Sequence, residues 1–313
     1  MQREPRRIGR RVLGRRVLFG AAGVAGLGVT QWLSLRGDFD HRSCRPERDA
    51  ASPWQPPVLP AGAADIVHVG HSTHLVRVAG LRVLTDPWFF DPAHGGMWHE
   101  HGPWVAPEHM GELDLVLITH EHPDHADPQA LDRLDKRALV VVATAALAAR
   151  VRGLGFAAVE RLSPWQSLSH RGLEISAVPA LHDIYEVGYV LRADAQRIYF
   201  AGDSALHRDL PSIAERFAPT TAILPVDGTR LRGEPRLVMN PTDAVQAVQV
   251  LKPRLVVTSH ADARFFDPVL SAYATQEVDA QARFARLLKA AAPHVRCAPW
   301  TAGARTQLPA ADV

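Results

Sequence analysis

The chemistry-bearing feature of this chain is the segment 118–125, which reads ITHEHPDH. It directly follows an apolar run, residues 113–119, that we expect to be a strand. Side chains two apart on an extended chain point the same way, so His120 and His122 can reach one metal ion together. Pro123 then turns the chain, and Asp124 and His125 can present further ligands. Imidazole nitrogen and carboxylate oxygen are the usual ligands of hydrolytic zinc, so the segment predicts a metal centre.

Three later positions share one arrangement, a ligand-type residue directly after an apolar segment that reads as a strand. They are His182, Asp203 and His260. Gly202 precedes Asp203 and allows the backbone to approach other groups closely. A single histidine in such a place is more often structural. Three together, downstream of a four-ligand motif, favour one shared site.

A second His-x-His sequence, at His99 and His101, lacks this context. It lies in a loop, residues 90–109, that is rich in Pro, Gly and Trp, and no Asp-His pair follows it. We expect a polar turn at the surface near the mouth of the site rather than a ligand pair.

The elements that must position these residues are short strands in the first half of the chain and alternating strands and helices in the second. The hydrophobic patterns predict strands at 65–69, 73–78, 81–85, 113–119, 138–142, 173–178, 186–192, 197–201, 221–225, 255–258 and 295–298, and helices at 145–151, 210–217, 242–251 and 280–291. Thr144 and Asn240 stand where helix caps belong. Two layers of sheet covered by helices would account for this order.

The charge of the chain is unevenly distributed. The chain has 313 residues and a formal net charge of +2, but residues 1–36 hold eight arginines against one acid. The remaining 27 basic and 32 acidic residues form an acidic body, which is poorly suited to binding nucleic acid. Cys44 and Cys297 are too few for a disulfide framework. Unpaired thiols are favoured, and a single bridge stays open if the protein is exported.

The first 36 residues have the pattern of a targeting segment. A basic stretch precedes nineteen uncharged, mostly apolar residues, 17–35, which would span about 28 Å as a helix. We expect a retained membrane anchor, or an exported protein, with the body on the periplasmic side. Arg15 and Arg16 resemble a twin-arginine signal, and an ordinary signal-anchor is the alternative. Residues 37–62 read as a Pro-rich linker, 63–303 as the catalytic domain and 304–313 as a tail.

These motifs resemble those of the metallo-β-lactamase superfamily, whose HxHxDH sequence stands here at 120–125. Within it, the chain is most similar to the branch of ascorbate-6-phosphate lactonase and N-acyl-phosphatidylethanolamine phospholipase D. That similarity rests on four segments: 70–73 (GHST), 85–87 (TDP), 201–204 (AGDS) and 256–260 (VVTSH). The resemblance implies an α/β fold, a four-layer αββα sandwich with the metal ions at one edge of its sheets.

The resemblance also implies which residues bind metal. One ion would be held by His120, His122 and His182, the other by Asp124, His125 and His260, with Asp203 bridging the two. Asp86 would hydrogen-bond a ligand histidine and fix its orientation; its alternative is a simple turn residue before a proline. Asp124 would also orient or shuttle a proton.

Two departures bear on the chemistry. Position 122 is His rather than the Glu of oxygen-reducing di-iron relatives, so zinc is favoured. The presence of Asp203 argues against a β-lactam substrate.

We therefore expect an enzyme with two divalent ions, Zn²⁺ by preference, that activates water to hydrolyse an ester, lactone or phosphodiester, including a phospholipase D-like phosphodiesterase. The substrate would be a small molecule or a lipid, membrane contact would be made through the N-terminal segment, and no nucleic-acid partner is expected. The alternatives are a nuclease of the same superfamily and a non-catalytic binding protein that keeps the fold.

Overall fold

The computed structural model describes residues 43–48, 54–60, 62–266 and 268–310. Residues 43–313 form one compact unit. The predicted anchor, 1–36, and parts of the predicted linker, 37–62, lie outside the described residues. Among those that are described, no helix is long and apolar enough to cross a bilayer. The membrane and export interpretations therefore stay predictions.

The first of two large sheets has seven strands in the order β18-β1-β2-β3-β5-β6-β7. Their bounds are β1 Asp65–Gly70, β2 Thr73–Val78, β3 Leu81–Thr85, β5 Leu115–Ile118, β6 Leu139–Val142, β7 Val159–Arg161 and β18 Arg305–Gln307. The pairs from β18 to β3 are antiparallel, and those from β3 to β7 are parallel.

The second sheet repeats this plan, in the order β17-β14-β12-β11-β10-β9-β8. Its strands are β8 Ser167–His170, β9 Leu173–Pro179, β10 Val187–Ala193, β11 Gln196–Phe200, β12 Thr221–Pro225, β14 Leu255–Ser259 and β17 Arg296–Cys297. The pairs from β8 to β11 are antiparallel and those from β11 to β17 parallel. Each sheet therefore has a parallel half, where the carboxyl ends of several strands lie along one edge.

The remaining elements are helices and two small ribbons. The helices are α2 Pro128–Arg133, α3 Ala145–Gly153, α4 Leu210–Phe217, α5 Pro241–Leu251, α6 Pro268–Tyr273, α7 Ala280–Ala291 and the 3₁₀ turn η1 Pro107–His109. One ribbon pairs β4 Met97–His99 with β15 Ala263–Phe265, the other β13 Arg230–Leu231 with β16 Ala274–Thr275.

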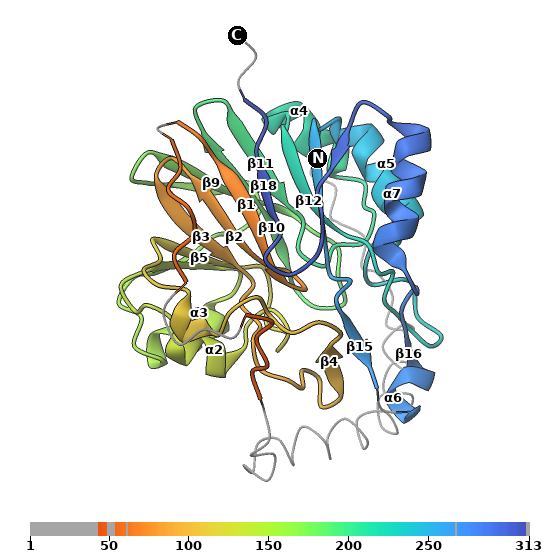
Figure 1. Ribbon diagram of the computed structural model, residues 1–313, viewed down its shortest axis with the longest axis horizontal. Helices are drawn as coiled ribbons and strands as arrows, with labels where there is room; N and C mark the ends of the chain where they lie inside the picture. The colour runs from red at the N-terminus through yellow and green to blue at the C-terminus, as the bar shows by residue number, and fades with distance from the viewer. Residues whose placement is uncertain (1–42, 49–53, 61, 267, 311–313) are drawn as a thin grey trace, which may run out of the picture. The chain divides into compact units, whose positions relative to one another are not determined.

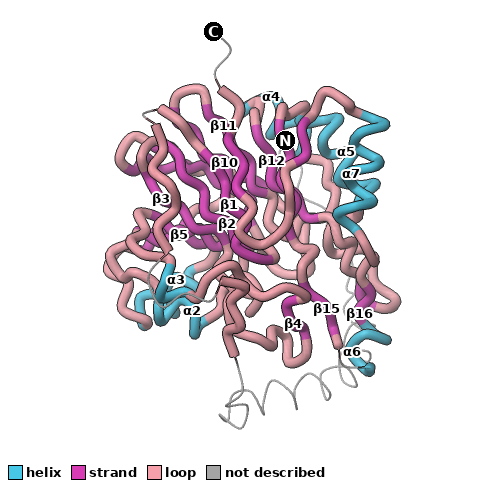
Figure 2. The backbone as a smooth tube through the Cα atoms, viewed as in Figure 1, coloured by secondary structure: helices cyan, strands magenta, loops and turns pink. Residues whose placement is uncertain are grey.

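Three apolar clusters show that the elements form four layers. The first joins inward-facing residues of both sheets, for example Val83, Leu117, Tyr189 and Phe200. The second lies between the first sheet and helices α2 and α3, and the third between the second sheet and helices α4, α5 and α7. Figures 1 and 2 show these helices outside the two sheets. The predicted αββα sandwich is confirmed.

Local sequence accounts for several boundaries. Helix α5 begins with a capping box, in which the Asn240 side chain accepts from the Asp243 N–H and Asp243 accepts from the Asn240 N–H. Thr144 caps α3 by accepting from the Leu147 N–H, as predicted. Ala79 and Gly80 both have positive φ, which suits a two-residue hairpin loop between β2 and β3.

One expectation about the end of the domain differs from the structure. Strand β18 pairs with β1, so the sheet extends past residue 303, where the sequence analysis ended the domain. This pairing joins segments 240 residues apart, which local patterning does not reveal. Cys44 and Cys297 are free, as the sequence favoured; they pack against different apolar clusters, and the alternative of a bridge is not realised.

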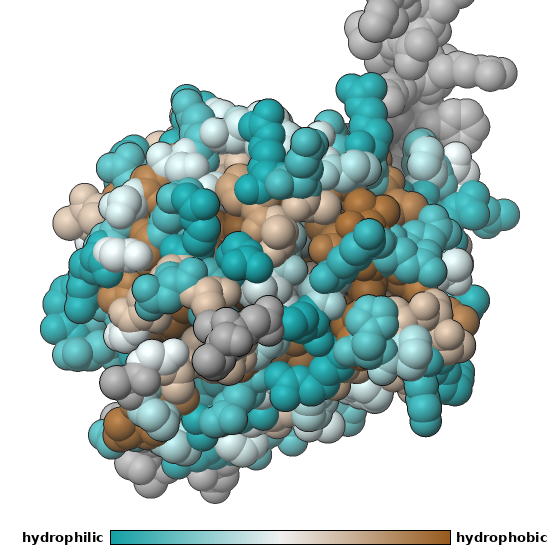
Figure 3. Space-filling view, turned by 90° about the horizontal axis from the view of Figure 1, so that it is seen from above, coloured by the Kyte–Doolittle hydropathy of each residue, from teal (hydrophilic) through white to brown (hydrophobic). Residues whose placement is uncertain are grey.

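The surface is mixed in polarity. On the face shown in Figure 3, hydrophilic side chains cover much of the area and separate the apolar regions. Scattered apolar surface of this kind is ordinary for a folded domain.

A buried charge cluster ties β18 and the chain before β1 to the first sheet. Asp65 accepts from Arg77 Nε at 2.7 Å and Nη2 at 2.5 Å, and it also accepts from Arg305. Arg77 Nη1 donates to the Pro57 carbonyl at 2.6 Å. Asp65 is fully buried and Arg77 nearly so, and charges in such a place are stable only when paired.

We expect Asp65→Ala to lower the free energy of unfolding by about 3–5 kcal/mol, because it leaves a buried guanidinium without its partner. Denaturant titration measures the loss. Glu112→Ala, which breaks the exposed Arg137–Glu112 pair, is the control and should change nothing measurable. Equal unfolding midpoints for Asp65→Ala and wild type would show that the cluster does not hold this edge.

Candidate metal centre

The predicted ligands converge at the carboxyl ends of the parallel strands. His120 lies just after β5, Asp203 just after β11 and His260 directly after β14. His182 lies on the loop between β9 and β10. Residues far apart in sequence thus meet at one edge of the two sheets, where α/β proteins commonly bind ligands.

One group of three histidines has its ring nitrogens around a common point. His122 Nδ1 lies 3.0 Å from His120 Nε2 and 3.2 Å from His182 Nε2. His120 is fully buried, whereas the His122 side chain is 22% exposed, so this group borders solvent. Burial, followed by the charges of His125 and His182, holds the pKa of His120 well below its usual value, which leaves a neutral imidazole able to bind a metal ion.

A second group surrounds one carboxylate oxygen. Asp124 Oδ2 lies 3.4 Å from His125 Nε2, 3.5 Å from His260 Nε2 and 3.6 Å from His71 Nε2. These four ligand atoms lie within 4.8 Å of one another, and all four residues are buried. The predicted set of Asp124, His125 and His260 is therefore assembled, with one histidine that the sequence analysis did not include.

Asp203 stands between the two groups. Its Oδ2 is 2.9 Å from His260 Nε2 and 3.0 Å from His125 Nε2 in the second group, and 4.0 Å from His120 Nε2 in the first. All seven predicted ligands are thus gathered in one place. Their role as ligands stays a prediction, which the geometry supports.

The donor set fits metal ions. His125 Nε2 and Asp203 Oδ1 are buried without a hydrogen-bond partner, although Asp203 Oδ2 is only 3.0 Å from His125 Nε2. Burial alone would lower the pKa of His125, but the carboxylates of Asp203 and Asp124 raise it well above its usual value. Carboxylates that hold protons on neighbouring imidazoles would equally hold a cation, which releases those protons on binding.

Three buried carboxylates contact the Nδ1 atoms of predicted ligand histidines. Asp86 Oδ2 accepts from His125 Nδ1 at 2.7 Å, Asp227 Oδ2 lies 3.0 Å from His260 Nδ1, and Glu186 Oε1 lies 3.1 Å from His120 Nδ1. Such partners fix the tautomer and orientation of ligand imidazoles. Asp86 makes the contact with a ligand histidine that was expected of it, and its role in orienting that ligand stays a prediction. Glu186 and Asp227 were not identified from the sequence.

Gly202 lets Glu186 approach the centre. It has φ +65°, and a Cβ built there would lie 2.2 Å from Glu186 Oε1. That oxygen also accepts from the Asp203 N–H at 2.7 Å. Burial raises the pKa of Glu186 to about 8. The close approach expected of Gly202 is confirmed.

His94 is a further residue that the sequence analysis missed. Its Nε2 lies 2.7 Å from Asp124 Oδ1, and its ring is 4.9 Å from that of His122. It sits on an irregular loop with no motif around it, so no sequence signal singled it out. His71, in contrast, follows the β1 strand as the predicted ligands follow theirs, so the same pattern could have found it.

The expectation for His99 was wrong. It lies on β4, buried rather than at the surface, with its ring stacked on Trp88 at 3.7 Å and its Nδ1 2.8 Å from Asp91 Oδ1. His99 belongs to the β4–β15 ribbon, where it pairs with Ala263, and sequence patterning does not reveal that pairing. His101 is exposed. Neither belongs to a candidate ligand group among the described residues.

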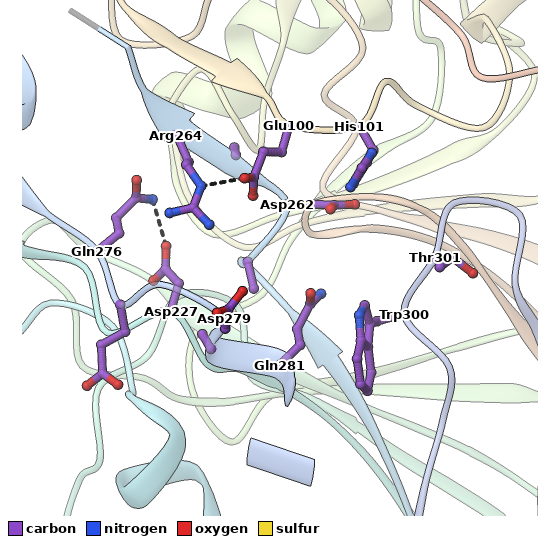
Figure 4. Close-up of a pocket in the computed structure, with 14 residues that line it drawn as sticks. Glu100, His101, Asp227, Asp262, Arg264, Gln276, Asp279, Gln281, Trp300 and Thr301 are labelled. Atoms are coloured by element: carbon purple, nitrogen blue, oxygen red, sulfur yellow. Dashed lines mark hydrogen bonds and ion pairs between the residues drawn. The ribbon is translucent and has the colours of Figure 1, made fainter. Parts of the chain in front are cut away.

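A cavity of about 230 Å³ adjoins the centre (Figure 4). Of the candidate ligands and their supporting carboxylates, only Asp227 lines it, and the Gln276 amide donates to Asp227 at 2.7 Å. The ligand groups themselves lie outside this cavity, so the chemistry is assigned to the sheet edge and not to the cavity.

Comparison with known proteins agrees with this centre. The family described as the beta-lactamase superfamily domain matches residues 65–260. A UPF0173 metal-dependent hydrolase of Methanopyrus kandleri is 29% identical over 207 residues, covering 62% of this chain and 83% of that protein. One from Caldivirga maquilingensis is also 29% identical, over 237 residues, covering 73% and 91%.

A solved structure supports the fold. The crystal structure of a possible metal-dependent hydrolase from Veillonella parvula has a TM-score of 0.67 at 18% identity, and covers 79% of this chain and 100% of that one. The family match extends over more than half of the chain and contains every predicted ligand. The chain belongs to the beta-lactamase superfamily and is a metal-dependent hydrolase.

Proposed function

We propose that this protein is a dinuclear zinc hydrolase that cleaves an ester, lactone or phosphodiester. The observation that carries the proposal is the position of Asp203 Oδ2, which faces His125 and His260 of one ligand group and His120 of the other. One carboxylate between two ligand groups suits a pair of ions. Histidine at position 122 gives the first group three imidazoles, which favours zinc.

The ligand groups would hold divalent ions, whose chemistry is to activate water and to stabilise negative charge on the scissile group. Asp124 Oδ2 faces the second ligand group, and Asp124 Oδ1 lies 2.7 Å from His94 Nε2. The His94 side chain is 30% exposed. Asp124 is thus placed to accept a proton, and His94 to pass that proton to solvent.

Substrate would approach from the side of the exposed members of the site. These are His94, His122 and Asp183, whose side chains are 30%, 22% and 33% exposed. Three exposed apolar side chains, Leu181, Ile184 and Tyr185, lie on the loop that carries His182. A substrate with an apolar part, such as a lipid, would find contacts there.

Asp124→Ala should retain its fold and lose about 10²–10⁴-fold in turnover, because a proton acceptor and a ligand are removed together. The measurement combines metal analysis with a panel of ester, lactone and phosphodiester substrates, and wild type should bind two ions. Asp132→Ala, on exposed helix α2 surface, is the control. Unchanged turnover in Asp124→Ala would refute the assigned role.

The same panel separates the alternatives. Turnover of single-stranded RNA with zinc or manganese, and of no other substrate, would replace the proposal with a nuclease. A metal-loaded protein without turnover on the whole panel would favour a binding protein.

Asp86→Asn should weaken metal binding about 10–100-fold with little loss of fold, because an amide cannot accept equally from His125 Nδ1 and the two Thr119 donors. Competition with a chromophoric chelator measures the affinity. Asp91→Asn, which alters a buried Asp–His contact outside the ligand groups, is the matched control. If both variants lose affinity equally, Asp86 has no special role in orienting a ligand.

A further inference from the structure

His71 occupies the turn between β1 and β2, next to the second ligand group. Its carbonyl accepts from the His260 N–H at 3.3 Å, so its backbone is tied to a predicted ligand. Its side chain is fully buried, and its backbone has φ +50°, a conformation that non-glycine residues rarely adopt. Unusual backbone of this kind gathers at functional sites.

The imidazole of His71 has no hydrogen-bond partner at either nitrogen. A neutral imidazole carries one N–H and one lone pair, and leaving such groups unpaired in the interior is unfavourable. His74, on the adjoining strand β2, shows the contrast. Its Nδ1 lies 3.1 Å from the Ser72 carbonyl and its Nε2 3.1 Å from His68 Nδ1.

The separations around Asp124 Oδ2 match those between ligands of one ion. With metal–ligand bonds of about 2.0–2.1 Å, neighbouring ligand atoms of a four- or five-coordinate ion lie roughly 2.9–3.6 Å apart. The His71, His125 and His260 Nε2 atoms lie 3.6, 3.4 and 3.5 Å from that oxygen. Each separation exceeds an ordinary N–H···O hydrogen bond. His71 stands in the same relation to Asp124 as the two predicted histidines do.

Packing directs the ring toward this point and away from solvent. Trp88 meets it edge-on at 5.1 Å between ring centroids, and the His260 ring lies at 4.2 Å.

We propose that His71 Nε2 is a further ligand of the ion held by Asp124, His125 and His260. This inference rests on the two-ion centre of the proposed function. It makes the centre asymmetric, because the buried ion would have four protein ligands besides Asp203. The solvent-facing ion at His120, His122 and His182 would have three besides Asp203, and would keep an open position for substrate.

The test compares His71→Phe with His99→Phe in the full chain. Both replace a buried histidine packed against Trp88, but only His71 belongs to a candidate ligand group. Zinc titration should show two ions on wild type and on His99→Phe. In His71→Phe the ion at His120, His122 and His182 should bind as in wild type. The dissociation constant of the other ion, which His71 would help to hold, should rise at least about 10-fold.

A second measurement on wild type does not depend on a folded variant. Protein labelled with ¹⁵N-histidine and loaded with ¹¹³Cd should show metal–nitrogen coupling to six imidazoles, His71 included. Coupling to five imidazoles, with none to His71, would overturn this inference and leave the two-ion centre intact. Fewer than two ions on wild type would overturn the proposed function and this inference together.

Discussion

The centre of this protein depends on the electrostatic balance between buried imidazoles and carboxylates. Asp124 and Asp203 lie where water hardly reaches, and anions in such a place require positive charge. In the protein alone, protons on His125 and His260 supply that charge, because the nearby carboxylates raise both pKa values. Divalent ions would supply it better, because they also satisfy ring nitrogens that have no hydrogen-bond partner.

The fold brings these charged side chains together from segments that lie far apart in the sequence. Each sheet changes from antiparallel to parallel pairing, and the parallel halves bring the ends of β3, β5, β11, β12 and β14 to one edge. From these ends come three predicted ligands, His120, Asp203 and His260, and two supporting carboxylates, Asp86 and Asp227. Apolar packing between the sheets fixes the separation of these ends, so the core sets the distances between ligand atoms.

Much of this arrangement could be predicted from local sequence. The HxHxDH segment and the three strand-end residues gave the seven candidate ligands, because a ligand-type residue after an apolar strand is visible without a structure. The capped helices α3 and α5 and the β2–β3 hairpin were recognised from their turn and cap residues.

The missing parts depend on long-range contacts. Glu186 supports His120 only because β10 lies beside β5 across the core, where Tyr189 Oη donates to the Ile118 carbonyl at 2.9 Å. His99 is buried because β4 pairs with a strand more than 160 residues later. Strand β18 joins β1 from the end of the chain. No periodicity or motif encodes these pairings, so a single sequence does not reveal them.

The most direct test of the account is the anomalous scattering of zinc in crystals of the metal-loaded protein. We expect two peaks about 3.5–4 Å apart on either side of Asp203. One should lie about 2.0–2.2 Å from His120 Nε2, His122 Nδ1 and His182 Nε2, and the other at similar distances from Asp124 Oδ2, His125 Nε2 and His260 Nε2. A single peak, or peaks outside this cluster at full zinc occupancy, would contradict the two-ion centre.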